Sequence, residues 1–111
     1  MTGVQTCALP ILVHDLERFG VGRERIYLDP VTQAVSANAH AGILALDAID
    51  GIRRELEGVN VISGLSNISF GLPNRSLVNR GFLTLAMKFG LNAAILDVDR
   101  KSTRLNSSHR L

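Results

Sequence analysis

Apolar residues recur at helical spacing in three stretches of the chain, residues 12–19, 39–57 and 75–89. Their apolar positions lie three or four residues apart, which predicts an amphipathic helix in each stretch. The stripe of the longest stretch consists of Ala45, Ile49, Ile52 and Leu56, and that of the last stretch consists of Val78, Phe82, Leu85 and Phe89. A glycine follows each stretch and is predicted to end the helix: Gly20, Gly58 and Gly90.

Three short runs outside these helices have the composition of buried strands. They are residues 25–29 (RIYLD), 60–65 (NVISGL) and 93–97 (AAILD), and they are rich in apolar residues on both faces. The resulting order of helix, strand, helix, strand, helix, strand indicates an α/β protein with a parallel sheet covered by helices. A doubly wound sheet and a TIM barrel share this pattern, and periodicity leaves both open.

In either architecture, ligands bind where the strands end. The first and third predicted strands end in Asp29 and Asp97, and the second is followed by a polar loop at residues 66–74 that leads into Arg75. We therefore expect the functional residues at this edge of the sheet. His40, at the start of the second helix, is predicted either to line the site or to play a structural or capping role.

Composition and charge narrow the class of protein. Hydrophobic residues make up 46% of the 111 residues and charged residues 20%, which is typical of a globular domain. The net charge of +2 arises in residues 100–111, which hold four basic residues and no acidic one, so the remainder has eight basic against ten acidic residues. This distribution argues against a nucleic-acid binder. No run approaches the roughly 20 apolar residues of a membrane span, which argues against a membrane protein.

Known sequence signatures exclude several chemistries. The lone cysteine, Cys7, cannot form a disulfide within the chain, which fits the reducing cytoplasm. The run at residues 64–68 (GLSNI) lacks the final glycine of a nucleophile elbow, and the chain contains no P-loop. The three histidines do not have the spacing of metal ligands, so no metal site is predicted.

The two ends differ in character from the middle. Residues 1–11 (MTGVQTCALPI) and 100–111 (RKSTRLNSSHRL) resemble translated sequencing-adapter sequence, and we find no helical or strand periodicity in them. We interpret them as a non-native leader and a non-native basic tail. The alternative is that they are genuine flexible termini.

Two motifs in the middle of the chain resemble a known family. The run at residues 26–30 (IYLDP) is followed, thirty-eight positions after Asp29, by Asn67 in the longer run at residues 64–75 (GLSNISFGLPNR). They resemble the methyltetrahydrofolate:corrinoid methyltransferases, which include the corrinoid iron–sulfur protein methyltransferase and the folate-binding domain of cobalamin-dependent methionine synthase. The second run is specific, whereas a strand followed by Asp-Pro also occurs in dihydropteroate synthases.

The resemblance implies a fold and a set of site residues. Residues 12–99 would be the C-terminal part of a pterin-binding TIM-barrel domain, with about three parallel strands, roughly the fifth to the seventh. Asp29 matches the aspartate that holds the pterin ring, Asn67 the asparagine that reaches pterin N5, and Arg75 an arginine near the substrate. The pterin-binding Asp and Asn of the family's earlier strands have no counterpart in this sequence.

The resemblance also implies a reaction. The N5-methyl group of methyltetrahydrofolate would pass to the Co(I) of a corrinoid (cobalamin) acceptor on a partner protein, and the parent protein would be a homodimer. Because negative charge would develop on N5, a donor aimed at that atom stabilises the transition state more than the ground state. The Asn67 amide can donate without titrating, and the Asp29 carboxylate can accept two adjacent N–H groups of the pterin.

Other interpretations stay open at this point. Asp29 could cap its loop, Asn67 could form a turn, and Arg75 could be a solvated helix residue. Asp97 fits a structural role, and Ser66 and Ser69 are predicted to satisfy backbone groups of the loop. A dihydropteroate synthase-like enzyme or an inactive truncated pterin-binding fragment are alternative functions. Because three strands cannot close a barrel, we expect the isolated chain to be inactive and marginally stable.

Overall fold

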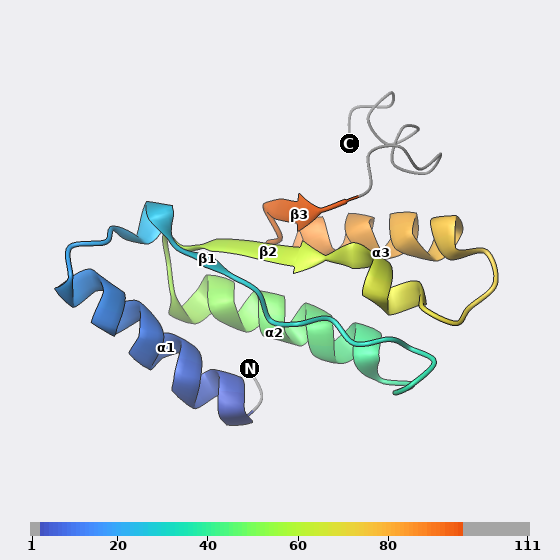
Figure 1. The fold of residues 1–111 in the computed structure, drawn as a ribbon, viewed down its shortest axis with the longest axis horizontal. Helices are drawn as coiled ribbons and strands as arrows, with labels where there is room; N and C mark the ends of the chain where they lie inside the picture. The colour runs from blue at the N-terminus through green and yellow to red at the C-terminus, as the bar shows by residue number, and fades with distance from the viewer. Residues whose placement is uncertain (1–2, 97–111) are drawn as a thin grey trace.

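The computed structural model describes residues 3–96 and shows an α/β arrangement (Figure 1). Its elements, in chain order, are α1 (Gly3–Arg18), η1 (Arg23–Arg25), β1 (Tyr27–Leu28), α2 (Ala41–Glu55), β2 (Asn60–Gly64), η2 (Leu65–Ser69), α3 (Arg75–Phe89) and β3 (Ala93–Ile95). The predicted alternation of helices and strands is confirmed, and so are the bounds of the last helix. The strands are shorter than predicted.

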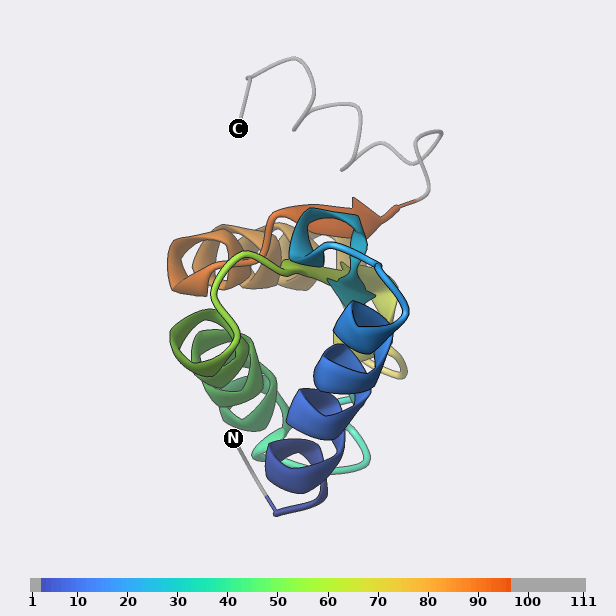
Figure 2. The ribbon, with the colours of Figure 1, turned by 90° about the vertical axis from the view of Figure 1, so that its left-hand side faces the viewer.

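The three strands of the described part form one parallel sheet in the order β1-β2-β3. Leu28 pairs with Val61, and both are buried, as is Ser63 two residues further along β2. Tyr27 is 57% exposed and Ile95 is 61% exposed, because their side chains point to the other face of the sheet. Helices α1 and α2 lie together on one side of the sheet (Figure 2). Among the described elements, helices therefore cover one face of the sheet and none covers the other (Figure 2).

The longest helix packs as its sequence pattern predicts. All four stripe residues of α2 are buried, with exposures of 6% or less: Ala45, Ile49, Ile52 and Leu56. They form one core with the buried side of β2, represented by Val59 and Val61. Asp50 and Arg54, which are four residues apart, form an ion pair at 2.9 Å on the outer side of the helix. Because Arg54 is 77% exposed there, this pair contributes little stability.

The predicted stripe on α3 is only partly correct. Phe82 is buried, but Leu85 is 48% exposed and Phe89 is 38% exposed, while Leu83 and Ala86 are buried instead. The helix packs against α2 and η2, so its buried face is turned toward those elements. Sequence spacing predicted the period of this helix correctly, but it did not identify which apolar side chains pack against another element.

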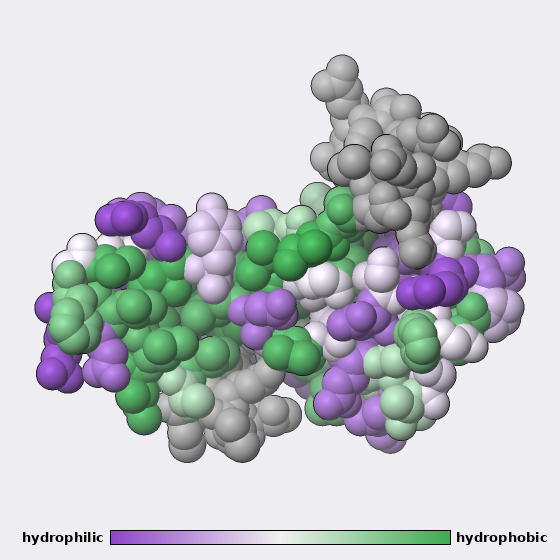
Figure 3. All heavy atoms as spheres, viewed as in Figure 1, coloured by the Kyte–Doolittle hydropathy of each residue, from purple (hydrophilic) through white to green (hydrophobic). Residues whose placement is uncertain are grey.

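The first helix differs more from expectation. It begins at Gly3 rather than at residue 12 and contains Pro10, so residues 3–11, which lack helical periodicity, are nevertheless helical. Val13 is fully buried, and Leu16 is partly buried against the core. The other two apolar residues that repeat at helical spacing in residues 12–19, Leu12 and Phe19, are 48% and 86% exposed. The helix thus meets the core along a different line from the predicted one. Apolar surface over α1 and β1 is visible on the left of Figure 3. In the part of the chain described, no helix has the length and hydrophobicity of a membrane span.

Asparagine side chains tie the three strands together at their N-terminal ends. Asn92 accepts the Val61 N–H at Oδ1 (2.9 Å) and donates from Nδ2 to Oδ1 of Asn60 (2.8 Å). Asn60 in turn donates from Nδ2 to the carbonyl oxygens of Glu24 (2.9 Å) and Ile26 (3.3 Å). These bonds fix where each strand begins relative to its neighbour, and thereby bring the opposite ends of β1 and β2 to one edge.

Candidate functional site

Two segments meet at the C-terminal edge of the sheet. The segment after β1 lies beside η2, which follows β2, and backbone and side-chain hydrogen bonds join them. The Val35 N–H donates to the Ile68 carbonyl (3.2 Å), and the Ser36 hydroxyl donates to the Phe70 carbonyl (2.7 Å). These bonds hold two loops, far apart in sequence, in a fixed relation.

A buried hydroxyl pair lies beneath these loops. Thr32 Oγ1 and Ser63 Oγ are 2.8 Å apart, and the two residues are 4% and 0% exposed. Each hydroxyl satisfies the other, so neither is left as an unpaired polar group in the core. The pair links the end of β2 to the segment after β1 and adds to the rigidity of this edge.

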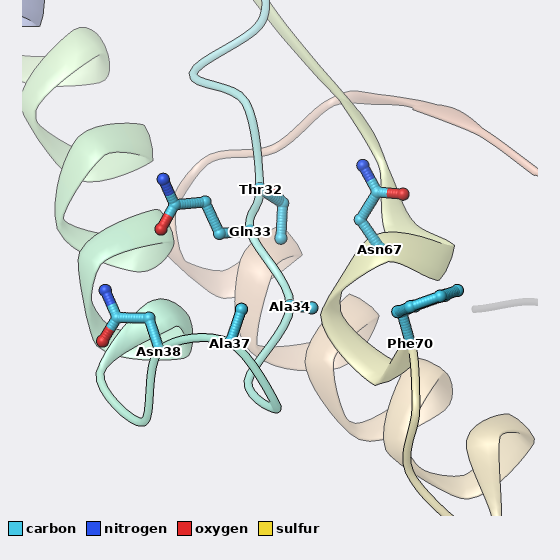
Figure 4. A pocket seen from close by; sticks show the side chains of 7 residues that line it. All are labelled: Thr32, Gln33, Ala34, Ala37, Asn38, Asn67 and Phe70. Atoms are coloured by element: carbon cyan, nitrogen blue, oxygen red, sulfur yellow. The ribbon is translucent and has the colours of Figure 1, made fainter.

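A cavity of about 450 Å³ opens between the two segments (Figure 4). Its lining consists of Thr32, Gln33, Ala34, Ala37, Asn38, Asn67 and Phe70. Small methyl groups make up part of the wall, and amide side chains supply donors and acceptors. A volume of this order falls within the range of about 300–1,000 Å³ that is common for small-molecule sites.

Asn67 is the predicted site residue that lines this cavity. It lies in η2, a short 3₁₀ helix at the start of the predicted polar loop, and residues 70–74 of that loop form neither helix nor strand. Its side chain is exposed, and its amide makes no hydrogen bond with residues 3–96. The amide group thus keeps two N–H donors and one acceptor oxygen for a ligand. In Figure 4 it extends from the turn beside Thr32.

Asp29 lies just outside the cavity lining, at the end of β1. Its Oδ1 accepts the N–H of Val31 at 2.8 Å, so the carboxylate stabilises the turn in the manner predicted for a loop cap. Val31 has φ = 59°, a conformation that β-branched residues rarely adopt. Asp29 is exposed, and its Oδ2 has no hydrogen-bond partner among residues 3–96. The carboxylate therefore holds the strained turn and still has one oxygen to offer.

Arg75 is directed at η2 and also lies outside the cavity lining. Its Nε donates to Ser69 Oγ (3.1 Å) and its Nη2 donates to the Ser66 carbonyl (2.9 Å). Its guanidinium carbon lies 5.9 Å from the centroid of the Phe70 ring. The side chain is half-buried by these contacts, so it is not the solvated helix residue of the alternative interpretation. It braces the turn that carries Asn67.

The remaining predicted residues have simpler positions. Ser69 Oγ also donates to the Ser66 carbonyl (3.2 Å), which confirms that a loop serine satisfies the backbone. His40 is exposed at the N-cap of α2, makes no side-chain capping bond and lies outside the cavity lining. Asp97 lies outside the described residues. Within residues 3–96, no three His, Cys, Asp or Glu side chains are grouped in a way that could hold a metal ion.

Sequence reasoning missed most of the cavity wall. Gln33 and Asn38 are polar residues of the segment after β1, where no element and no site residue had been predicted. Phe70 lies at the end of the η2 turn. The available signal was position alone, since these residues directly follow the ends of two predicted parallel strands. Their proximity to one another depends on hydrogen bonds that the sequence does not reveal.

A family model and three known proteins are similar to this chain. A family model described as "Pterin binding enzyme" matches residues 8–98. A methylcorrinoid:tetrahydrofolate methyltransferase from Eubacterium limosum is 38% identical over 78% of this chain and 32% of its own length. Methionine synthases of Mycobacterium leprae and Mycobacterium tuberculosis are 32% and 30% identical over 80% of this chain and 8% of their own length.

The chain thus spans about a third of the first relative and less than a tenth of the methionine synthases. The family match extends over most of its residues and includes both segments that form the cavity. None of these three relatives is named as a dihydropteroate synthase. The chain therefore belongs to the family of pterin-binding enzymes.

Proposed function

We propose that this chain is part of an enzyme that transfers the N5-methyl group between methyltetrahydrofolate and a corrinoid on a partner protein. The observation that carries the proposal is the free amide of Asn67 on a cavity of small-molecule size at the strand ends. Parallel α/β proteins bind ligands at this edge. The names of the relatives, which include methylcorrinoid and tetrahydrofolate, agree with this substrate class.

The reaction suits an amide donor. When the methyl group leaves, the C–N5 bond breaks and its electron pair stays on N5, which takes up a proton from solvent or an acid. The corrinoid acceptor would supply the electron pair for the new bond to carbon. A donor at N5 stabilises the charge that develops there, an interaction stronger in the transition state than in the ground state. Asn67 would be that donor, and its neutral amide works at any pH at which the protein is folded.

The direction of transfer follows from the substrates supplied. The name of the Eubacterium limosum protein presents the methylcorrinoid as donor and tetrahydrofolate as acceptor. The same transition state is crossed in both directions, so a donor that lowers its free energy accelerates both. We expect the parent enzyme to run either way, with the direction set by the reduction state of the corrinoid and the methylation state of the folate.

Asp29 and Arg75 would support the substrate in different ways. The Oδ2 atom of Asp29 is available to accept an N–H of the pterin ring, while Oδ1 holds the Val31 turn. Arg75 would lie near the substrate and act on it through η2, because its guanidinium donates to Ser66 and Ser69 of that helix in this structure. The proposed substrate-binding set is thus Asp29, Asn67 and Arg75.

The open sheet supports the proposal that the chain belongs to a larger barrel. In the described part, β1 and β3 each have one unpaired edge, and the uncovered face bears the exposed side chains of Tyr27 and Ile95. A closed barrel would pair both edges and cover that face. We propose that residues 12–99 supply roughly the fifth to seventh strands of a TIM barrel, in a cytoplasmic, homodimeric parent protein, and that the isolated chain is inactive.

The catalytic role of Asn67 is tested by an Asn67→Asp substitution in the complete enzyme. The change keeps the side-chain size and replaces the amide donor by an acceptor. By analogy with the deletion of an oxyanion donor, a loss of about 2.7–4 kcal/mol predicts a kcat that is lower by roughly 100- to 1,000-fold. The folate Kd should change far less. Ser76→Ala, an exposed position in the first turn of α3, is the control. Equal losses in binding and turnover would remove Asn67 from the catalytic role.

The inactivity of the isolated chain needs a separate experiment. The 111-residue chain is mixed with methyltetrahydrofolate and reduced cobalamin, and the absorbance of methylcobalamin is followed. We expect no turnover, because the chain lacks the upstream pterin contacts of the family. Measurable turnover would refute this view and would show that residues 12–99 form a working site without the rest of a barrel.

A further inference from the structure

Phe70 is an exposed aromatic residue on the wall of the cavity. Its side chain is 65% exposed, although the two residues before it, Ile68 and Ser69, are buried. Exposed phenylalanines are common enough on protein surfaces that exposure alone says little. This one, however, lines the same cavity as Asn67. Its position relative to Asn67 and its contacts indicate a role in ligand binding.

The backbone of Phe70 is fixed on both sides. Its carbonyl oxygen accepts the Ser36 hydroxyl at 2.7 Å, and its N–H donates to the Asn67 carbonyl at 3.2 Å. The guanidinium of Arg75 lies 5.9 Å from the ring centroid, close enough for a cation–π contact. The ring therefore has a defined place and does not need to be ordered when a ligand arrives, which lowers the entropic cost of binding.

Phe70 and Asn67 are neighbours through the geometry of the turn. The bond from the Phe70 N–H to the Asn67 carbonyl spans three residues, as in a 3₁₀ helix, and side chains three residues apart in such a helix are eclipsed. Figure 4 shows both side chains projecting from this turn, one above the other. A ligand atom that is bonded to the Asn67 amide therefore has its adjoining groups within reach of the Phe70 ring.

We infer that Phe70 is a further substrate-binding residue and that its ring stacks on the aminobenzoyl ring of the folate. The inference rests on the proposed function, in which the Asn67 amide donates a hydrogen bond to N5. The reduced ring that contains N5 is puckered and offers no flat aromatic surface. The carbon next to N5 carries, through a methylene group, the aminobenzoyl group, which is flat and aromatic. Phe70 lies one turn after Asn67, so its ring can stack on the aminobenzoyl group. Arg75 holds the Phe70 ring in place through the cation–π contact.

The experiment compares two probes on the complete enzyme. One is methyltetrahydrofolate, and the other is 5-methyltetrahydropterin, which has the same N5 centre without the aminobenzoyl group. The variant is Phe70→Leu, which stays apolar but loses the aromatic ring. The matched control is Phe19→Leu, because Phe19 is also an exposed aromatic residue (86%) and lies directly after α1. Phe70→Tyr, which keeps the ring, is the rescue variant.

The expected result is selective. Phe70→Leu should raise the Kd of methyltetrahydrofolate roughly 2- to 12-fold, the range typical of an aromatic pair, and leave the Kd of the pterin unchanged. Phe70→Tyr and Phe19→Leu should match the unaltered enzyme with both probes. An unchanged folate Kd in Phe70→Leu, or an equal rise for both probes, would overturn the inference. If the unaltered enzyme binds neither probe, the proposed function itself fails.

Discussion

Replacing Arg75 by methionine would remove the guanidinium that braces the η2 turn. The substitution keeps an apolar stem of similar length, so the packing of the first turn of α3 changes little. It deletes the bonds from Nε to Ser69 Oγ (3.1 Å) and from Nη2 to the Ser66 carbonyl (2.9 Å), together with the contact to the Phe70 ring. We expect the turn that carries Asn67 to open more often.

These contacts set the size of the effect. A hydrogen bond to a charged group contributes about 1.5–3 kcal/mol, and an exposed cation–π contact about 0.5–1 kcal/mol. The Ser66 carbonyl keeps its bond from Ser69 Oγ (3.2 Å), so the deletion leaves no buried acceptor without a partner there. Together these contacts amount to about 3.5–7 kcal/mol, but water replaces part of them because Arg75 is only half-buried, so the free energy of opening the turn should fall by about 2–4 kcal/mol.

Amide hydrogen exchange reports this opening directly, because a peptide that covers residues 65–75 contains the η2 amides. A loss of about 2–4 kcal/mol lowers protection roughly 30- to 900-fold, with the rate of an unstructured peptide as the limit. The α2 peptide, residues 41–55, should keep its protection and serves as the internal control. Arg75→Lys should show an intermediate loss, because lysine is a point charge without the planar fork. A change of less than about 3-fold in the methionine variant would refute the bracing role.

Three further predictions concern backbone geometry. Gly90 has φ = 124°, and an added Cβ would collide with the side chain of Arg53, which donates from Nε to the Gly90 carbonyl (2.6 Å). Gly90→Ala should therefore destabilise the protein by about 2–3 kcal/mol, measured by urea denaturation followed by far-UV circular dichroism. Val31→Gly should instead stabilise it by about 0.5–2 kcal/mol in the same assay, because relief of roughly 1–3 kcal/mol of strain exceeds the entropic cost of a glycine. Asn92→Ala leaves the Val61 N–H without its acceptor. The free energy of opening that protects this amide from hydrogen exchange should therefore fall by about 1–3 kcal/mol.

Controls for these predictions lie within the chain. Gly81 is an exposed residue in the middle of α3, with open space where an added Cβ would lie. Gly81→Ala should therefore stabilise the protein by about 0.5–1 kcal/mol, whereas Gly90→Ala destabilises it. Asn92→Asp keeps the acceptor for Val61 and loses only the bond to Asn60, so it should protect the Val61 amide better than alanine does. A stabilising Gly90→Ala, a destabilising Val31→Gly or an unaffected Val61 amide would contradict the respective argument.

The order of the elements and the edge at which the site lies could be predicted from the sequence. The α2 stripe from Ala45 to Leu56 was correct in every position, because a helix buried along one side must repeat its apolar residues with the helical period. The strand that ends before Asp29 and the one that ends near Asn67 were also found in sequence, since short apolar runs between helices indicate parallel strands. Neither inference requires knowledge of which elements touch.

Contacts between distant segments could not be predicted in the same way. The pattern of α3 indicated its period, but Leu85 is exposed because no described element packs on that side, and Val13 rather than Leu12 carries α1 into the core. Resemblance supplied Asp29 and Arg75 as pterin ligands, and their roles stay predictions. The structure adds that one holds the turn at Val31 and the other braces η2.

The cavity wall shows the same division. Asn67 was identified from its motif, but the residues opposite it lie about thirty positions earlier in the chain, and they meet it because Ser36 and Val35 bond to the η2 turn. Local sequence fixes backbone preference and amphipathic period, which depend on near neighbours. The shape of a pocket depends on how separate segments pack, and that is a property of the folded chain as a whole.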